Sequence, residues 1–241
     1  MKRASKNSSG PRYPEQVVSR YPLRASLLVL LLAVAAPLLT GCSETTAAEG
    51  AAKPTAASSC PKTWRAGWQD LANRIQAPVY CPTWLPSPLT ARIGRDWNRM
   101  SAVSREGLSL AESVAKDRSY LLSILWYGGT TAEVHVVMRG YPGSTRIPRC
   151  TNTTTVNGQA QNAQVPCFQD RQGVRQVGRF RVTVYTRNRG ADAWHVLYAF
   201  HHDGSLYTVS QHVTPPTTYP QAVRNLNRIL RGLVLVEPHT Q

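Results

Sequence analysis

Three of the six histidines in this chain could be brought together by a sheet to bind a metal ion. His195 and His212 lie in two strand-like runs, 194–202 and 205–213, joined by Asp203-Gly204. Asp-Gly is a strong signal for a two-residue type I′ turn, and that turn makes His195 face His212. Imidazoles at facing positions have Cβ atoms roughly 5 Å apart and could share Zn²⁺ or Cu²⁺.

A metal site here needs a third ligand, and His135 is the candidate. It lies on a separate predicted strand whose place in the sheet the pattern does not fix. The hairpin face that carries the two histidines also carries Leu197 and Leu206. We therefore expect His195 and His212 to form a surface or half-buried pair with no third ligand, and we predict no metal and no cofactor.

No catalytic residue is predicted. The chain lacks the Gly-x-Ser-x-Gly and His-Glu-x-x-His motifs of hydrolases and metalloproteases. Gly128-Gly129 belongs to a predicted hairpin turn and precedes no helix, so it cannot cradle a phosphate.

Four cysteines, Cys60, Cys81, Cys150 and Cys167, remain after Cys42 and could form two disulfides. Three connectivities are possible. We favour Cys60–Cys81 and Cys150–Cys167, because each closes a short local loop. A four-cysteine zinc site is disfavoured, because the gaps are much longer than its usual Cys-x2–4-Cys spacing.

Hydrophobic periodicity predicts a helix at each end of the domain and strands between them. Residues 144–175 are expected to be a loop. The predicted elements are a helix over 64–75, an extended proline-rich segment over 77–88, strands over 120–127, 132–138 and 180–187, the hairpin, a helix from Thr217 or Thr218 to Gly232, and a strand over 233–236. This order indicates an α+β fold in which the two helices cover one face of a curved antiparallel sheet, with two disulfides.

An apolar run over 26–39 follows a basic segment and is too short to span a membrane, so it is typical of an export signal. Its ending, Leu39-Thr40-Gly41-Cys42, closely resembles the lipobox of bacterial lipoproteins. The resemblance implies cleavage before Cys42 and acylation of that cysteine, palmitate included. The domain limits are then a signal peptide over 1–41, a flexible tether over 42–59, one domain over 60–238 and a tail over 239–241.

The hairpin and helix over 202–232, with the proline-rich stretch 78–86, resemble exported bacterial domains of unknown function. Those domains are related to sigma-factor regulator and lipoprotein-carrier folds. This resemblance implies a fold and a compartment, and no reaction.

The part of the chain after residue 41 has 22 basic and 12 acidic residues, a net charge of about +10, which raises the question of a nucleic-acid partner. The arginines are dispersed, no nucleic-acid motif is present, and export separates the protein from nucleic acid. We expect no nucleic-acid partner. The membrane, reached through Cys42, is the expected partner, and anionic lipid or acidic wall polymer could be another; no protein partner is indicated.

The sequence thus predicts a lipoprotein on the outer face of the cell membrane, with a non-catalytic binding or envelope-support role. One alternative is a carrier of a lipid or other apolar ligand, in a cavity lined by residues such as Trp126, Val184 and Tyr198. The other is an enzyme that acts on the cell wall.

Replacing Cys42 with alanine should release the protein from the membrane, because stable anchoring requires two or more acyl chains. Detergent partitioning should move Cys42→Ala to the soluble fraction. An unchanged membrane fraction would refute the lipobox.

Overall fold

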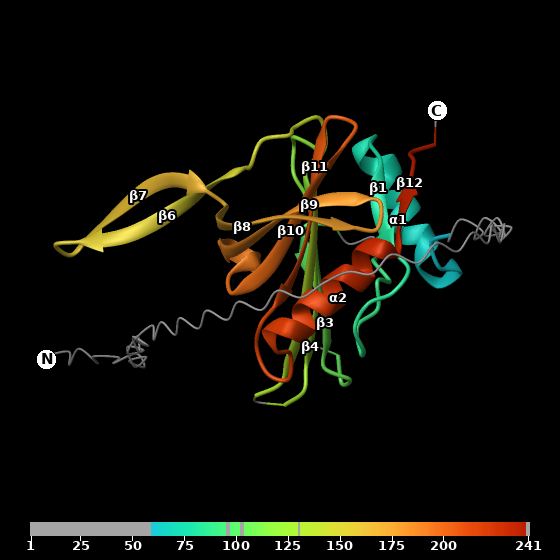
Figure 1. Cartoon of the computed structure of the whole chain (residues 1–241), viewed down its shortest axis with the longest axis horizontal. Helices are drawn as coiled ribbons and strands as arrows, with labels where there is room; N and C mark the ends of the chain where they lie inside the picture. The colour runs from blue at the N-terminus through green and yellow to red at the C-terminus, as the bar shows by residue number, and fades with distance from the viewer. Residues whose placement is uncertain (1–58, 95–96, 102–103, 130, 240–241) are drawn as a thin grey trace, which may run out of the picture. The chain divides into compact units, whose positions relative to one another are not determined.

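The computed structural model describes residues 59–94, 97–101, 104–129 and 131–239 (Figure 1). The predicted signal over 1–41 and the tether as far as residue 58 lie outside the described residues. In chain order the elements are α1 (Lys62–Ile75), β1 (Val79–Pro82), β2 (Arg99–Met100), β3 (Leu108–Val114), β4 (Tyr120–Tyr127), β5 (Glu133–Tyr141), β6 (Arg149–Val156), β7 (Gln159–Pro166), β8 (Phe168–Val177), β9 (Phe180–Asn188), the 3₁₀ helix η1 (Gly190–Asp192), β10 (His195–His202), β11 (Ser205–His212), α2 (Tyr219–Arg231) and β12 (Leu233–Val236).

Eight of these strands form one antiparallel sheet in the order β2-β3-β4-β5-β11-β10-β9-β8. Two smaller sheets pair β1 with β12 and β6 with β7. The described chain is therefore mostly antiparallel sheet with two α-helices, which confirms the α+β class. The order places β11 between β5 and β10, so β5 lies beside a strand more than sixty residues further along the chain.

The β10–β11 hairpin has the register predicted from its turn. His195 pairs with His212, and Phe200 pairs with Tyr207. Asp203 and Gly204 at the tip have φ angles of 44° and 68°, the positive values that a type I′ turn requires. The hairpin prediction is confirmed.

One face of the sheet packs with both helices into a single hydrophobic cluster. Tyr198, Phe200, Tyr207 and Val209 are all buried in it, as the register predicts. α2 contacts β10 and β11, whereas α1 contacts β1 and β12. The two helices therefore contribute to one core while resting on different sheets.

The opposite face of the sheet is also partly covered, which corrects the expectation that only one face is buried. Leu197, Ala199 and Leu206 form a second buried cluster with Cys167 and Phe168. Phe168 is the first residue of β8, and Cys167 lies just before it, between β7 and β8. The chain that enters β8 at the edge of the sheet therefore shields this face.

The expectation of a loop over 144–175 is wrong, because this stretch forms β6, β7 and most of β8. β6 and β7 are almost wholly exposed, so they show no apolar alternation to reveal them as strands. Cross-strand polar bonds support the pair, such as that from Thr153 to Asn162. Asn157-Gly158 forms its turn, with φ angles of 51° and 76°.

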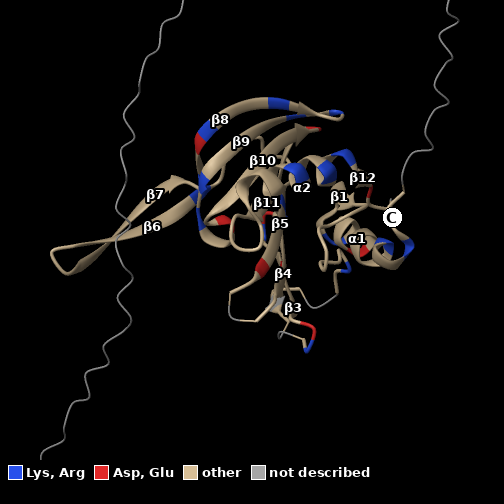
Figure 2. Cartoon of the chain, turned by 60° about the horizontal axis from the view of Figure 1, so that its bottom comes forward, with Lys and Arg blue, Asp and Glu red and all other residues tan. Residues whose placement is uncertain are grey.

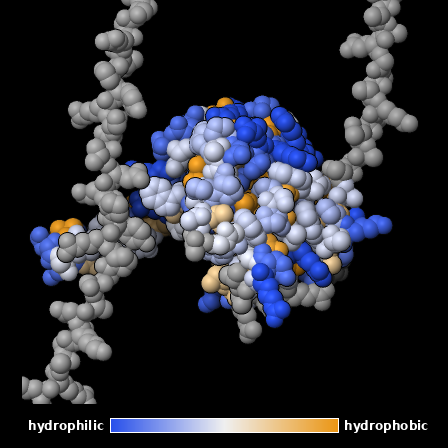
Figure 3. Space-filling view, turned by 90° about the horizontal axis from the view of Figure 1, so that it is seen from below, coloured by the Kyte–Doolittle hydropathy of each residue, from blue (hydrophilic) through white to orange (hydrophobic). Residues whose placement is uncertain are grey.

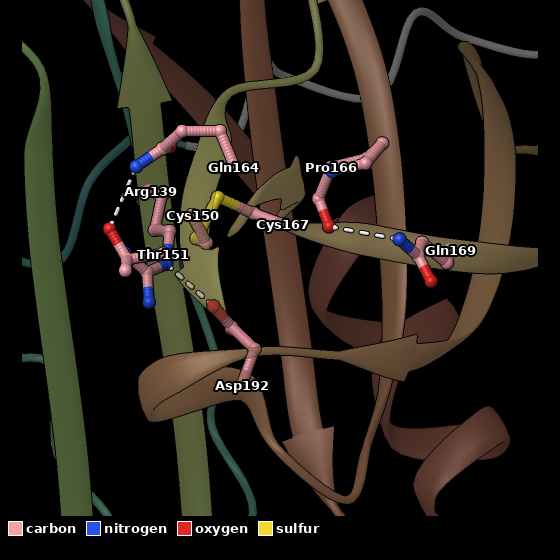
Figure 4. Close-up of a disulfide and its surroundings, with 8 residues drawn as sticks. All are labelled: Arg139, Cys150, Thr151, Gln164, Pro166, Cys167, Gln169 and Asp192. Carbon is pink, nitrogen blue, oxygen red and sulfur yellow. Dashed lines mark hydrogen bonds and ion pairs between the residues drawn. A yellow bond between two sulfur atoms is a disulfide. The ribbon is translucent and has the colours of Figure 1, made fainter. Parts of the chain in front are cut away.

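The two disulfides are Cys60–Cys81 and Cys150–Cys167, the pairing favoured from the sequence. Cys150–Cys167 closes the base of the β6–β7 hairpin (Figure 4). Cys60–Cys81 joins the start of the domain to β1.

Removing the second disulfide should loosen the β6–β7 hairpin before it affects the large sheet. In Cys150→Ala/Cys167→Ala, loss of the loop-closure constraint should destabilise the protein by about 3 kcal/mol. Hydrogen exchange should rise in β6 and β7 and stay slow in β10 and β11.

The matched variant Cys60→Ala/Cys81→Ala opens a loop of similar size around α1. It should leave exchange in β6 and β7 unchanged. Equal protection of the hairpin with and without Cys150–Cys167 would contradict this account.

Candidate metal centre

Three neighbouring strands place His135, His195 and His212 on the same face of the sheet. The β10–β11 register sets His195 opposite His212. The pairing of β11 with β5 ends at Gln211 and Val136, so His212 and His135 each stand one position beyond that pair. Residues at facing positions of adjacent strands share a face, so the order β5-β11-β10 makes a row of imidazoles.

The nitrogen atoms of the three imidazoles converge. One ligand atom from each histidine lies within 4.8 Å of the other two. Nε2 of His195 is 3.2 Å from Nδ1 of His135. The rings of His195 and His212 stack with centroids 5.1 Å apart.

This geometry corrects two expectations about the histidines. His135 does approach the pair as a possible third ligand. His195 is only 2 % exposed, so it belongs to the buried part of the sheet and not to its surface. His212 and Glu133 are partly exposed, at 21 % and 24 % of their side chains, and they form the open side of the cluster.

Each imidazole has a further polar partner, and in His135 and His195 this partner uses the ring nitrogen that does not face the other histidine. Nε2 of His135 is 2.7 Å from the Ser123 hydroxyl, and Nδ1 of His195 is 2.8 Å from the Ser210 hydroxyl. Nδ1 of His212 lies 2.8 Å from the Glu133 carboxylate. Outer hydrogen bonds of this kind orient metal-binding histidines and fix their tautomers.

An ion pair at η1 determines where the protons of this network lie. Arg139 donates to Oδ2 of Asp192 at 2.6 Å, and the Ser210 hydroxyl donates to Oδ1 of the same carboxylate at 2.5 Å (Figure 4 shows the ion pair). Because the Ser210 proton is used there, its oxygen accepts from Nδ1–H of His195. The lone pair of His195 is therefore on Nε2, the atom that faces His135.

The proton between His135 and His195 then belongs to Nδ1 of His135, which donates to Nε2 of His195. Nε2 of His135 accepts from the Ser123 hydroxyl. If the proton of His135 moves to Nε2 and the Ser123 hydroxyl rotates to accept it, both facing nitrogens carry lone pairs. The network can therefore present two nitrogen ligands without creating a charge.

Burial keeps both of these imidazoles neutral. Desolvation lowers the pKa of His135 to about 4, despite the opposing effect of the Glu133 carboxylate. Desolvation, with His135, His212 and Arg139 nearby, lowers the pKa of His195 to about 2. The 3.5 Å contact between His135 and Glu133 is thus a contact of a neutral ring, and neutral imidazole is the form that binds metals.

The remaining described histidines lie away from this cluster. His201 contacts the carbonyl of Thr145, and His202 lies 3.6 Å from Asp203. His239 is near the end of the chain, where its backbone N–H bonds to Asn73. They serve as internal controls for the centre.

Sequence reasoning named the three histidines and missed their partners. Ser123, Glu133, Arg139, Asp192 and Ser210 come from four strands or helices whose order in space is not sequential. The one available signal was the alternation of β5, which places Glu133 and His135 on the side opposite to Val134 and Val136. Cys42, the predicted lipidation residue, lies outside the described residues.

Comparisons with known proteins add no relative: no family model matches the chain, and neither a curated protein nor a solved structure matches it. Neither helix within the described ranges has the length and apolar character needed to cross a membrane.

The neutral histidines should make the metal-free protein less stable in mild acid. In the unfolded chain both histidines take up protons as the pH falls through about 6.5, whereas in the folded protein they stay neutral until about pH 4 and below. The unfolded state thus binds more protons in that window, and stability falls with the pH. Between pH 7.5 and 5.5 the two groups should contribute a loss of about 2–3 kcal/mol.

Urea unfolding with a chelator present at several pH values measures this slope. His239→Gln should keep the slope of the unchanged protein. His135→Gln/His195→Gln should flatten it, and an equal slope in that variant would contradict the assignment.

Proposed function

We propose that this protein is a lipid-anchored extracytoplasmic protein whose domain binds one divalent transition-metal ion, Zn²⁺ or Cu²⁺, in a non-catalytic role. The observation that carries the proposal is the convergence of three imidazole nitrogens, with the outer nitrogens of His135 and His195 already held by Ser123 and Ser210. Imidazole ligands suit both ions.

The distances support a tetrahedral site. Bonds of 2.0–2.1 Å from Zn²⁺ to two histidines place their nitrogens about 3.3 Å apart. The observed separation between His195 and His135 is 3.2 Å. His212 has to move only a short way inward, and it is the last residue of β11 and partly exposed.

Glu133 supports the fourth position. Its Oε1 lies 2.8 Å from Nδ1 of His212 and 3.5 Å from Nδ1 of His135, so a carboxylate stands beside two of the three rings. An ion would take this oxygen or a water molecule on the open side of the cluster. A negative charge there also offsets the charge that a divalent ion brings into a partly buried site.

The location rests on two features. The lipobox ending at Cys42 supports export and anchoring, with the membrane as the partner and anionic lipid or wall polymer as further contacts. The two disulfides in the domain support an oxidising compartment. The proposal keeps the curved sheet, with a helix at each end of the domain, as the scaffold of the site.

The alternative of an apolar-ligand carrier has less support. Val184 and Tyr198 are fully buried in the main core, and Trp126 packs against that core, so these residues contact protein and not an empty cavity. On the face seen in Figure 3, hydrophobic residues form small separate spots on a mostly hydrophilic surface.

Metal binding can be measured directly on the purified chain. After treatment with a chelator and its removal, titration calorimetry with Zn²⁺ and elemental analysis should find one ion per chain. His212 is the most exposed of the three histidines. His212→Gln should therefore weaken binding at least about 100-fold, while thermal unfolding of the metal-free protein changes little. Asp192→Asn should weaken binding about 10–100-fold through the outer shell.

His201→Gln and His202→Gln remove histidines outside the centre and are the matched controls. Both should bind Zn²⁺ as the unchanged protein does. If His212→Gln and the controls bind equally, the ion is held elsewhere and the proposal fails.

A further inference from the structure

A cleft of about 480 Å³ lies at the end of β10 remote from the histidine cluster. It has an apolar wall and a basic wall. Tyr80, Phe180 and Leu235 supply the first, and Arg179, Arg181 and His202 contribute to the second. Its volume falls within the range of small-molecule sites.

Arg179 is held in place at the rim of this cleft. Its Nη2 donates a hydrogen bond of 2.9 Å to the carbonyl oxygen of Leu233, and the guanidinium carbon lies 5.0 Å from the centre of the Phe180 ring. A guanidinium has five N–H donors, so most of its donors are left for a ligand. Holding the group in advance reduces the entropy that an incoming anion must offset.

Positive charge dominates this part of the surface. Arg181 is the second residue of β9, two positions after Arg179 in the chain. Neither arginine forms an ion pair with a carboxylate of the described chain. A Cβ on Gly178 would lie 3.4 Å from Cγ of Arg231, so the end of α2 brings a further arginine to the β8–β9 turn. Figure 2 shows basic residues along β8, β9 and α2. Two acidic groups lie at this end: Asp203, 3.6 Å from His202, and Glu237, whose charge, like that of Asp203, adds to the effect of burial in raising the pKa of Tyr80.

The apolar wall is rigid. The Tyr80 ring makes edge contacts with Phe180, Phe200 and Tyr207, with centroids 4.9–5.4 Å apart. Burial raises the pKa of Tyr80 to about 12, so its hydroxyl keeps its proton and can act as a donor at neutral pH. Basic donors beside a fixed aromatic surface suit a ligand with an anionic head and an uncharged body.

We propose that this cleft binds an organic phosphate, with the phosphate on Arg179 and Arg181 and the uncharged part against Tyr80 and Phe180. Arginine forks match phosphate oxygens in pairs, which favours phosphate over a simple halide. The site is independent of the metal centre, because the two lie at opposite ends of β10.

The source of the phosphate is either a lipid headgroup or a soluble phosphate ester. Cys60 is bonded to Cys81, the neighbour of Tyr80, so the chain enters the domain beside the cleft. An anchor at Cys42 would hold this end close to the bilayer, which favours the headgroup. The binding chemistry itself does not depend on that anchor.

Calorimetry on the mature full chain in a neutral detergent tests the site, with inorganic phosphate, glycerol phosphate and dihexanoyl phosphatidylglycerol as probes. We expect at least one of the two organic phosphates to bind saturably, and we expect that binding to weaken as the salt concentration rises. Tightest binding of the short-chain lipid assigns the headgroup as the source, and equal binding of glycerol phosphate assigns a soluble ester.

Arg181→Gln should weaken binding about tenfold or more, because it removes a charged hydrogen-bond donor. Arg179→Gln should do the same. The Arg181 side chain has no hydrogen bond to the described chain, so Arg181→Gln should fold normally and tests the site even if Arg179→Gln does not fold. Arg224→Gln removes the same charge from the exposed side of α2 and should have no effect. No saturable binding, tightest binding of inorganic phosphate, or equal weakening by Arg224→Gln overturns the proposal.

Discussion

The register of β10 against β11 is the constraint on which the rest of this structure depends. Two residues, Asp203 and Gly204, set it by adopting positive φ angles. β11 pairs on its other edge with β5, so the same register also aligns a distant strand. Because side chains alternate across a sheet, a slip of one residue would turn aromatic core residues outward and break the row of histidines at the same time.

The buried histidines remain neutral because burial in a dry environment opposes their charged forms, and their hydrogen bonds replace the water that they lose. The ion pair of Arg139 and Asp192 orders that network from one end, and Glu133 closes it at the other. The centre is therefore a set of polar contacts that joins β4, β5, β10, β11 and η1, on the side of the sheet away from the main core.

Local chemistry could be predicted from the sequence, and long-range order could not. The hairpin, both helices and both disulfides follow from turn residues, helical periodicity and short cysteine loops. β6 and β7 were missed because they bury almost nothing, and β3 because its short run carries mixed burial. His135 could be placed only by knowing that β5 pairs with β11, a pairing between strands separated by five others in the chain.

The Cys60–Cys81 disulfide has a mechanical consequence. A pull on the chain ahead of Cys60 passes through the sulfur bridge directly to β1, so the intervening helix α1 carries no load. β1 is paired with β12, which leads to the other end of the chain. Tension between the two ends therefore runs through one small pair of strands, and the eight-stranded sheet, with its histidines, stays outside the line of force.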